Sequence, residues 1–596
     1  MGLLQKAVET YDAMAHRAGQ VFEGENEPLA PISHMMARAQ IEITLDQDGR
    51  FVSARAVEKE APKIIIPVTE ESAGRTSAPC AHPLCDQLGY VAPYDEKKHA
   101  LYVDVLSDWA NSEYTHPKLQ PILAYVRGGT ILSDLSGGEL IALTSEGDPA
   151  DEKLMVCWVV NGLGETLNGP CWTDQALMNA FIDYYREKQA DMSPALCMIS
   201  GEMEIPAGQH PKGIIPINGN AKLISANDSS GFTYRGRFDD AAQAATVSYV
   251  ASQKAHSALR WLVANQNVSF GGRTFLCWNP QGIQIPKVTG PMGRRNGTVQ
   301  RAANPSQYQK QLREALSGWK ENLPQSAGVV IAAFDAATTG RLAVTYYNEL
   351  LASDFLDRLH DWEATCCWEN GPYGIQSPSL FQIVSWAFGT PRNGKAETDD
   401  RILSQQMQRL VACRVDKALF PLDIERALVE KASHLLLYEG ENRQKLLFTA
   451  CAAIRKYHCD HSKEEWDMAL DKNCFNRSYL FGRLLAIADA IENSTYTDED
   501  RRETNAIRMQ KAFTLRPMTT WSALWDKLRP YNKRLAQSKP GLYRYYHGMI
   551  DDILNRFSPF DSTLNQKLDD IYLLGYSHQR AYRIEKTDQQ ETEEES

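Results

Sequence analysis

The 596-residue sequence lacks the short motifs that mark the commonest active sites. It contains no GxxxxGK[ST] phosphate loop, no HExxH zinc helix, no GxSxG nucleophile elbow and no EF-hand spacing. The corresponding nucleotide-hydrolysing, zinc-protease, serine-hydrolase and calcium-binding classes therefore have no support. We expect no enzyme, no cofactor and no bound metal.

Long apolar runs and paired cysteines are also missing. No stretch approaches the about 18 apolar residues that a membrane-spanning helix needs. Residues 1–20 carry four charged side chains where a secretion signal would be apolar, at Lys6, Glu9, Asp12 and Arg17. The 12 cysteines include no CxxC pair, so we expect reduced thiols in a cytoplasmic protein.

A few cysteines and histidines do stand near one another in the sequence. The densest group is Cys451, His458, Cys459 and His461, which lacks the spacing of a zinc site. We interpret these residues as structural and keep zinc as the alternative.

Acidic residues are absent from one long segment, although the whole chain has a net charge of −12. A uniformly acidic protein would repel a polyanion. Yet the 73 residues from Ala241 to Arg313 contain no Asp or Glu. This first basic segment holds nine positive residues: Lys254, Arg260, Arg273, Lys287, Arg294, Arg295, Arg301, Lys310 and Arg313.

A second basic segment runs from Arg501 to Tyr545. Eleven basic residues stand there against Glu503 and Asp526, so the local net charge is +9. A charge run is often only a solvated face, but two of them in an acidic chain favour a nucleic-acid partner.

The first 350 residues show mixed helix and strand patterns. Apolar residues at helical spacing, including Leu4 and Tyr11, predict a short first helix. Alternation over 41–45 followed by Asp48-Gly49 predicts a β-hairpin. Further strands are expected at 63–68, 154–160, 195–199, 274–278 and 329–334.

Beyond about residue 350 the pattern becomes helical. Helices with a single apolar face must pack on one another, so we predict an α+β protein: a mixed α/β N-terminal region followed by an all-α C-terminal bundle. Pro530 should end or kink its helix, and residues 586–596 are polar enough for a disordered tail. The apolar stripes lie at 480–491, 521–528, 546–557 and 564–572.

Helices of a bundle leave their basic residues outward, where they can follow a nucleic-acid strand. The second basic segment lies on such helices. The candidate single-strand contacts are therefore Arg508, Lys511, Lys527, Arg529, Lys533 and Arg534.

The segment 197–237 is rich in small and hydrogen-bonding residues. Its glycines allow close backbone approach, its amides and hydroxyls suit phosphates or base edges, and its aromatic side chains could stack on bases. A glycine-rich connection between strands would have the same composition, and both interpretations stay open here. With two arginines of the first basic segment, the candidate duplex-DNA contacts are Lys212, Lys222, Ser225, Asn227, Tyr234, Arg235, Arg237, Arg294 and Arg295.

One adjacent His-Asp pair, His360-Asp361, could belong to an HD-type metal phosphohydrolase. Such an enzyme needs further distant His and Asp ligands. The surrounding residues 357–362 also fit the charged face of a helix, which is the interpretation that we favour.

Several motifs in order carry a family resemblance. Residues 84–91 read LCDQLGYV, residues 200–202 read SGE, residues 210–212 read HPK and residues 223–227 read LISAN. Near the C-terminus, residues 479–484 read YLFGRL and residues 574–580 read LGYSHQR. This set, spread over about 500 residues, resembles the large subunit of the type I-C (Dvulg subtype) CRISPR Cascade complex.

The resemblance implies a non-catalytic, RNA-guided subunit of antiviral defence. Such a subunit sits at the crRNA 5′ end beside the processing subunit and also meets backbone and small subunits. It recognises the protospacer-adjacent motif on duplex DNA, aids R-loop formation and recruits a helicase-nuclease. Base pairing reads the long target, while protein reads only the short motif.

The resemblance also implies a division of the chain into three parts. Residues 1–350 would contact the crRNA 5′ end and duplex DNA, and residues 351–467 would form a helical link. Residues 468–596 would resemble a small subunit that binds the displaced single strand, with Met468 as a candidate internal start. The alternatives are an HD-type metal-dependent nuclease and a generic scaffold protein.

Overall fold

The molecule consists of two compact units, and the chain passes from one to the other three times. In the computed structural model, unit 1 contains residues 1–283 and 330–349, and unit 2 contains residues 284–329 and 350–596. The structure describes residues 2–594 except 76–77, 226–245, 267, 293–300, 339, 393–394, 498–501 and 559–560. The α+β class is confirmed, with most strands in unit 1 and mainly helices in unit 2.

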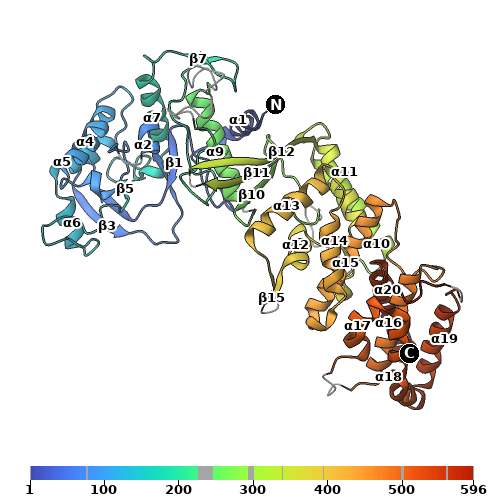
Figure 1. The fold of residues 1–596 in the computed structure, drawn as a ribbon. Coiled ribbons are helices and arrows are strands. Elements are labelled where there is room, and N and C mark those ends of the chain that lie inside the picture. Colours follow the sequence, from blue (N-terminus) through green and yellow to red (C-terminus); the bar gives the residue numbers. More distant parts are fainter. Residues whose placement is uncertain are drawn as a thin grey trace. The chain divides into compact units, whose positions relative to one another are not determined.

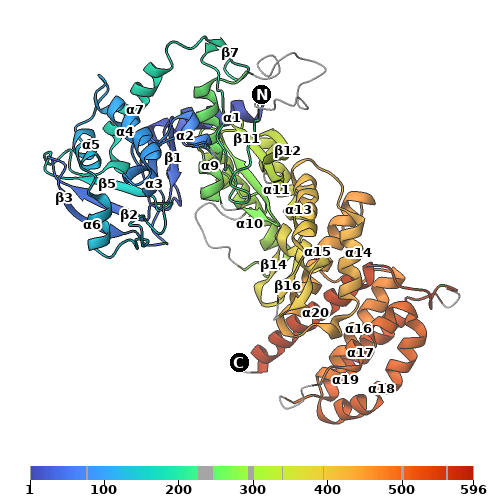
Figure 2. The same cartoon turned by 60° about the vertical axis from the view of Figure 1, so that its left-hand side comes forward.

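One core of unit 1 is built around a four-stranded mixed sheet in the order β3-β2-β5-β6. Strand β2 (Ile41–Leu45) pairs antiparallel with β3 (Phe51–Ala56) and parallel with β5 (Val156–Val160). The expected hairpin is confirmed, and Gly49 in its turn has φ 77°. Figure 2 shows α4, α5 and α6 beside this sheet. The short strand β6 is Gly169–Pro170, and the helices are α4 (Glu96–Ala110), α5 (Leu119–Gly128) and α6 (Ile131–Gly137).

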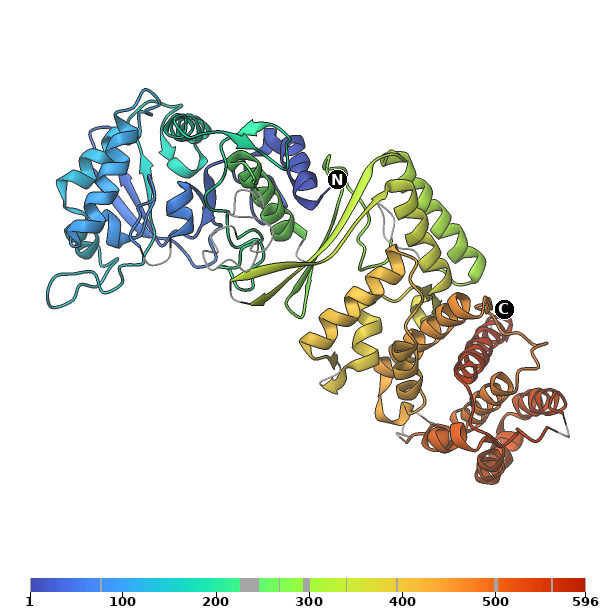
Figure 3. The same cartoon turned by 45° about the horizontal axis from the view of Figure 1, so that its top comes forward.

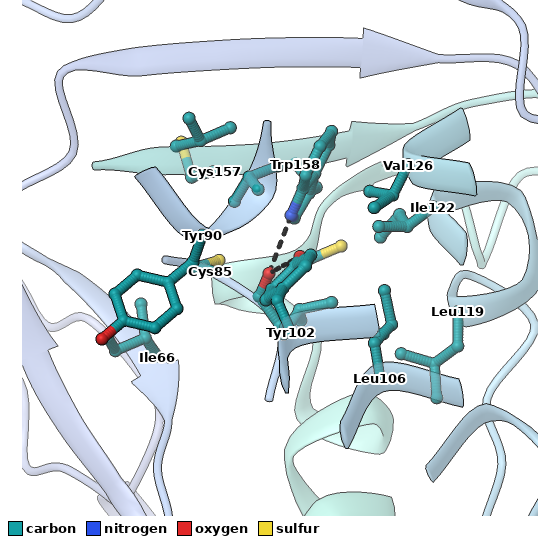
Figure 4. Packing of buried hydrophobic residues seen from close by; sticks show 14 of the residues in the cluster. Ile66, Cys85, Tyr90, Tyr102, Leu106, Leu119, Ile122, Val126, Cys157 and Trp158 are labelled. Atoms are coloured by element: carbon teal, nitrogen blue, oxygen red, sulfur yellow. Dashed lines mark hydrogen bonds between the residues drawn. The ribbon is translucent and has the colours of Figure 1, made fainter. Parts of the chain in front are cut away.

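A shared hydrogen-bond acceptor organises this core. The hydroxyl of Tyr102 and the indole N–H of Trp158 both donate to the carbonyl oxygen of Leu84. Figure 4 shows the two side chains turned toward each other among Leu106, Ile122 and other aliphatic residues. Because buried polar groups must be paired, this arrangement fixes the start of the LCDQLGYV motif against the sheet.

A second core of unit 1 lies between helices and an antiparallel sheet in the order β12-β11-β10-β9. Helices α1 (Leu3–Met14) and α9 (Tyr249–Gln266) pack against each other, and the indole of Trp278 donates to Thr10 Oγ1 at 2.9 Å. Figure 3 shows β11 and β12 as long neighbouring strands. The strands are β9 (Ser269–Phe270), β10 (Arg273–Trp278), β11 (Gly328–Thr338) and β12 (Arg341–Leu351).

The remaining elements of unit 1 are short or peripheral. The first helix and the strands predicted at 154–160, 274–278 and 329–334 are confirmed, and the strand predicted at 63–68 is β4. The strand predicted at 195–199 is only the two-residue β7, paired with β8. These elements are β1 (His34–Ala37), β4 (Ile64–Pro67), α2 (Glu70–Gly74), α3 (Leu88–Val91), α7 (Gln175–Lys188), β7 (Ala195–Leu196) and β8 (Met203–Glu204).

Unit 2 is a helical assembly with two small hairpins. Helix α16 is buried from Ser478 to Glu492 and contacts α17, α18, α19 and α20, which Figure 1 shows grouped around it. Its helices are α10 (Pro305–Asn322), α11 (Ala352–Thr365), α12 (Leu380–Phe388), α13 (Asp400–Val415), α14 (Leu422–Ala432), α15 (Gly440–His461), α16 (Arg477–Asn493), α17 (Asn505–Leu515), α18 (Pro517–Ser538), α19 (Pro540–Leu554) and α20 (Ile571–Glu594). The hairpins are β13 (Trp368–Glu369) with β14 (Ile375–Gln376), and β15 (Thr390–Arg392) with β16 (Lys395–Glu397).

Of the two outcomes expected for Pro530, an end of the helix is excluded, because α18 continues to Ser538 and buries Leu528 and Leu535 on either side of the proline. One helical prediction is wrong. The stripe at 564–572 is not one helix, since α20 begins at Ile571 and the backbone N–H of Leu568 instead donates to Thr514. Helix α20 runs on to Glu594, through the stretch whose composition predicts disorder.

Two glycines let α16 and α20 approach closely. A Cβ atom on Gly482 would overlap the carbonyl oxygen of Tyr572, and one on Gly575 would overlap that of Tyr479. Around this crossing, the hydroxyl of Tyr479 hydrogen-bonds His578 Nδ1 at 2.8 Å. The YLFGRL and LGYSHQR motifs therefore specify one helix–helix contact.

A buried ion pair ties the chain segment before α10 to two later helices. The side chains of Arg414 on α13 and Glu363 on α11 are 1% and 4% exposed, and their charged atoms are 2.7 Å apart. The same guanidinium donates to the carbonyls of Val288 and Gly290, and Glu363 accepts the N–H of Met292. This network holds the segment around residue 290 in unit 2.

No helix in the described part of the chain is long and apolar enough to cross a membrane.

We expect Gly482→Ala and Gly575→Ala each to destabilise unit 2 by about 1–3 kcal/mol, because the added methyl group must push α16 and α20 apart. Gly548→Ala is the matched control. A Cβ there meets nothing within 4 Å, so the better helix propensity of alanine should leave stability unchanged or raise it. Urea unfolding followed by tryptophan fluorescence measures both effects, and equal midpoints for all three variants would contradict the close contact.

Removing one partner of the buried ion pair should be more damaging. Glu363→Ala leaves the Arg414 guanidinium uncompensated in the interior, so we expect a loss of about 3–5 kcal/mol. The control is Asp526→Ala, which breaks an exposed pair with Arg529 and should leave the urea midpoint unchanged. A Glu363→Ala protein as stable as the control would show that the pair does not hold this segment.

Candidate nucleic-acid interface

The structure places only some of the predicted duplex-DNA contacts. Lys212, Lys222 and Ser225 are described, and all three are half-buried in unit 1. The others lie outside the described residues: Asn227, Tyr234, Arg235, Arg237, Arg294 and Arg295. The proposed reading loop is thus seen at its N-terminal side alone.

Lys212 and Lys222 stand directly opposite each other on antiparallel chain segments. The ammonium group of Lys212 donates to the carbonyl of Arg75 at 3.4 Å. Burial lowers the pKa of both lysines, and the positive charges of Lys222, Arg75 and Arg260 lower the pKa of Lys212 further. Two cations are thereby held close together in a partly desolvated place.

Buried polar residues lie close to this pair in the sequence and in unit 1. The imidazole of His210 hydrogen-bonds Ser252 Oγ at 2.9 Å and stacks on His256 at 6.2 Å between ring centroids. Burial lowers the pKa of His210 to about 4, so this histidine is neutral near pH 7. Burial also raises the pKa of Glu70 to about 7, and its carboxylate accepts the backbone N–H of Gln209.

The first basic segment does not form one unpaired surface. Lys254 pairs with Asp12 at 2.7 Å, and Arg273 pairs with Asp335 at 2.8 Å. The guanidinium of Arg260 donates to the backbone carbonyl of Lys212, and burial lowers its pKa to about 10. The acidic partners that the segment lacks in sequence therefore come from other elements of unit 1.

The second basic segment has a different environment. On α18, buried Leu524, Leu528 and Leu535 share one stripe, and the basic residues point away from it as predicted. The aromatic residues Trp525 and Tyr531 are half-buried beside this face. The exposed basic residues of the segment include Arg508 on α17 and Lys527, Arg529, Lys533 and Arg534 on α18, besides Arg502, Arg516, Lys539 and Arg544.

Not every predicted single-strand contact is equally available. Lys511 is half-buried and pairs with Glu430 on α14, and Arg529 pairs with Asp526 at 2.7 Å. Within the described ranges, the side chains of Arg508, Lys527, Lys533 and Arg534 form no ion pair or hydrogen bond. We call these four residues the basic face of α17–α18.

His360-Asp361 lies on α11 without further ligands. His360 Nδ1 and Asp361 Oδ1 are 3.9 Å apart, and the Asp361 side chain is 66% exposed. No group of three or more His, Cys, Asp or Glu residues able to hold a metal occurs in the part of the chain that the structure covers. The pair therefore fits the charged helix face that we favoured.

The cysteine and histidine group near residue 455 is also dispersed. His458 pairs with Asp570 at 2.8 Å, and His461 hydrogen-bonds the carbonyl of Phe420. Cys451 is buried against the carbonyl of Leu573. These side chains bind separate protein partners and do not converge on one point.

The fold and its charged surfaces define a two-unit α+β protein with separate basic patches. A comparison with known families then identifies the relatives: residues 8–584 match the family of CRISPR-associated proteins named Cas_Csd1. The chain belongs to this family. No curated protein matches the sequence closely enough to be named.

Proposed function

We propose that this CRISPR-associated protein is the non-catalytic large subunit of a type I-C surveillance complex. It would sit at the crRNA 5′ end beside the processing subunit, recognise the protospacer-adjacent motif on duplex DNA, aid R-loop formation and recruit the helicase-nuclease. Membership of the Cas_Csd1 family is compatible with a Cascade subunit. The single structural observation that carries the proposal is the basic face of α17–α18.

The basic face suits a displaced single strand. Its four cations are exposed to solvent on two helices that pack against each other, so they can meet phosphates without unfolding any element. Electrostatic contacts to the backbone are independent of sequence and are strengthened by nearby aromatic side chains. The acidic remainder of the chain would confine the strand to this face.

The bundle that carries this face is not isolated from the preceding helices of unit 2. Trp368 stacks on His578 at 4.5 Å between ring centroids and donates to Ser577 Oγ at 2.9 Å. Met468, the candidate internal start, lies 3.3 Å from Cys367 between their sulfur atoms. A free product starting at Met468 would leave these groups uncovered, so we place the single-strand function in the full chain.

The loop from Lys212 to Arg237 is proposed to contact the target duplex. Lys212 and Lys222 in its described part are paired through their backbones and carry positive charge suited to phosphates. The residues proposed to read bases are the polar and aromatic ones farther along, including Asn227 and Tyr234.

We expect the purified chain to cleave neither DNA nor RNA. His360-Asp361 is the one adjacent His-Asp pair, and among the described residues it belongs to no group of three or more possible metal ligands. The measurement is incubation with linear and supercoiled DNA and with RNA in the presence of Mg²⁺ or Mn²⁺. Nicking that depends on the metal and disappears in His360→Ala would establish the nuclease alternative.

Neutralising the basic face should weaken single-strand binding without unfolding the bundle. The variant replaces Arg508, Lys527, Lys533 and Arg534 by glutamine. For single-stranded DNA bound to the assembled complex, we expect the slope of log affinity against log salt to flatten by about 0.7 for each phosphate that the protein no longer neutralises. The melting temperature should be unchanged, because exposed charges contribute little to stability.

The control variant removes the same number of positive charges, but from lysine and arginine residues that already pair with acidic side chains. Lys310, Lys320, Arg409 and Lys445 pair with Glu314, Asp357, Asp423 and Glu441. The quadruple glutamine variant of these residues should keep the parental salt slope. Equal slopes in both variants would mean that the basic face is only solvated charge.

A further inference from the structure

Three basic residues form a row across three neighbouring chain segments in unit 1. Lys212 is paired antiparallel with Lys222, and Lys222 is paired parallel with Arg341, the first residue of β12. The backbone bonds that set this register run from Gly213 N to Ala221 O at 3.2 Å, from Lys222 N to Gly340 O at 3.1 Å and from Leu342 N to Lys222 O at 3.0 Å. Directly paired residues point their side chains to the same face.

Such a row is unfavourable for the free protein. Like charges directly opposite on neighbouring strands repel each other. The ammonium group of Lys222 has no ion pair or hydrogen bond in the described part of the chain, and that of Lys212 reaches only a backbone carbonyl at 3.4 Å. Burial lowers the pKa of both lysines, and the positive charges of Lys222, Arg75 and Arg260 lower the pKa of Lys212 further.

The surrounding groups compensate the row only in part. Arg75 is already neutralised by Asp86, with which it makes two hydrogen bonds, at 2.8 and 2.5 Å. Glu70 is the acid that acts on Lys222, but its pKa of about 7 leaves it with roughly half its charge at neutral pH. Arg260 adds a further cation and holds the carbonyl of Lys212 in place.

We propose that Lys212, Lys222 and Arg341 bind consecutive phosphodiester groups of one nucleic-acid strand. Two steps across adjacent strands span about 10 Å, whereas the first and third of three consecutive phosphates on one DNA strand are separated by about 7 Å of axial rise, and the long side chains can cover the difference. Lysine is a flexible point charge without the planar fork of arginine, so it suits phosphate contacts that position a strand more than base edges that identify it. This inference rests on the proposed function and assigns Lys212 and Lys222 to positioning, which leaves motif reading to other residues.

The test uses the assembled complex with Lys212, Lys222 and Arg341 replaced by glutamine. Affinity for duplexes with a correct and an incorrect motif should fall by the same factor, so the motif preference is kept. The slope of log affinity against log salt should flatten by about 0.9 per contact, hence by about 2.7 for three. The melting temperature of the free chain should be unchanged or higher, because repulsion within the row is relieved.

The matched control is Lys97→Gln with Lys153→Gln and Arg186→Gln, three exposed residues of unit 1, which should keep the parental slope. A second binding arm measures crRNA with the same variants. A slope that flattens for crRNA but not for duplex DNA would support the phosphate site and would identify crRNA as the strand that it binds. Unchanged slopes for both nucleic acids, or a changed motif preference, would overturn the proposal.

A single charge-reversal variant tests the proposal even if the triple variant fails to fold. Lys212→Glu places a carboxylate beside Lys222, Arg75 and Arg260, where it is electrostatically favoured, so the variant should fold and still lose nucleic-acid affinity. Parental affinity in this variant would also overturn the proposal. If the unmutated complex bound neither duplex nor crRNA, the proposed function itself would fail.

Discussion

The buried ion pair between Arg414 and Glu363 constrains unit 2 more than any other single interaction described above. Two desolvated charges need hydrogen bonds in the interior, and here backbone groups of Val288, Gly290 and Met292 supply several of them. The segment before α10 is therefore bound to α11 and α13.

The close crossing of α16 and α20 shows what the recognisable motifs do physically. Gly482 and Gly575 remove side chains where the two backbones meet, and Tyr479 and His578 close the gap with a hydrogen bond. Likewise, LCDQLGYV begins at the carbonyl that Tyr102 and Trp158 share. These three motifs specify packing, whereas the HPK and LISAN motifs contain Lys212, Ser225 and Asn227, which are proposed to bind nucleic acid.

The fold decides which basic side chains are paired with acidic ones. Lys254 and Arg273 belong to a segment without acids, yet each has an acidic partner from another element. Lys511 stands in the second basic segment but pairs with Glu430. By contrast, Arg341 joins Lys212 and Lys222 although it belongs to neither basic segment. The density of charge along the sequence therefore identified two basic segments. Strand pairing and helix packing decided which positive side chains are neutralised and which lie side by side.

The sequence by itself determined the α+β class, the hairpin at Gly49 and the family resemblance. It also determined that the lysine and arginine side chains of α18 point outward. These features follow from alternation, helical spacing and turn residues, which are local properties. The sequence misjudged the stripe at 564–572 as one helix, although α20 begins only at Ile571. Only the tertiary structure decided the route of residues 284–329 and the row formed by Lys212, Lys222 and Arg341. Both depend on contacts between residues more than 100 positions apart, and no local pattern encodes which distant partner a charge or a backbone N–H will meet.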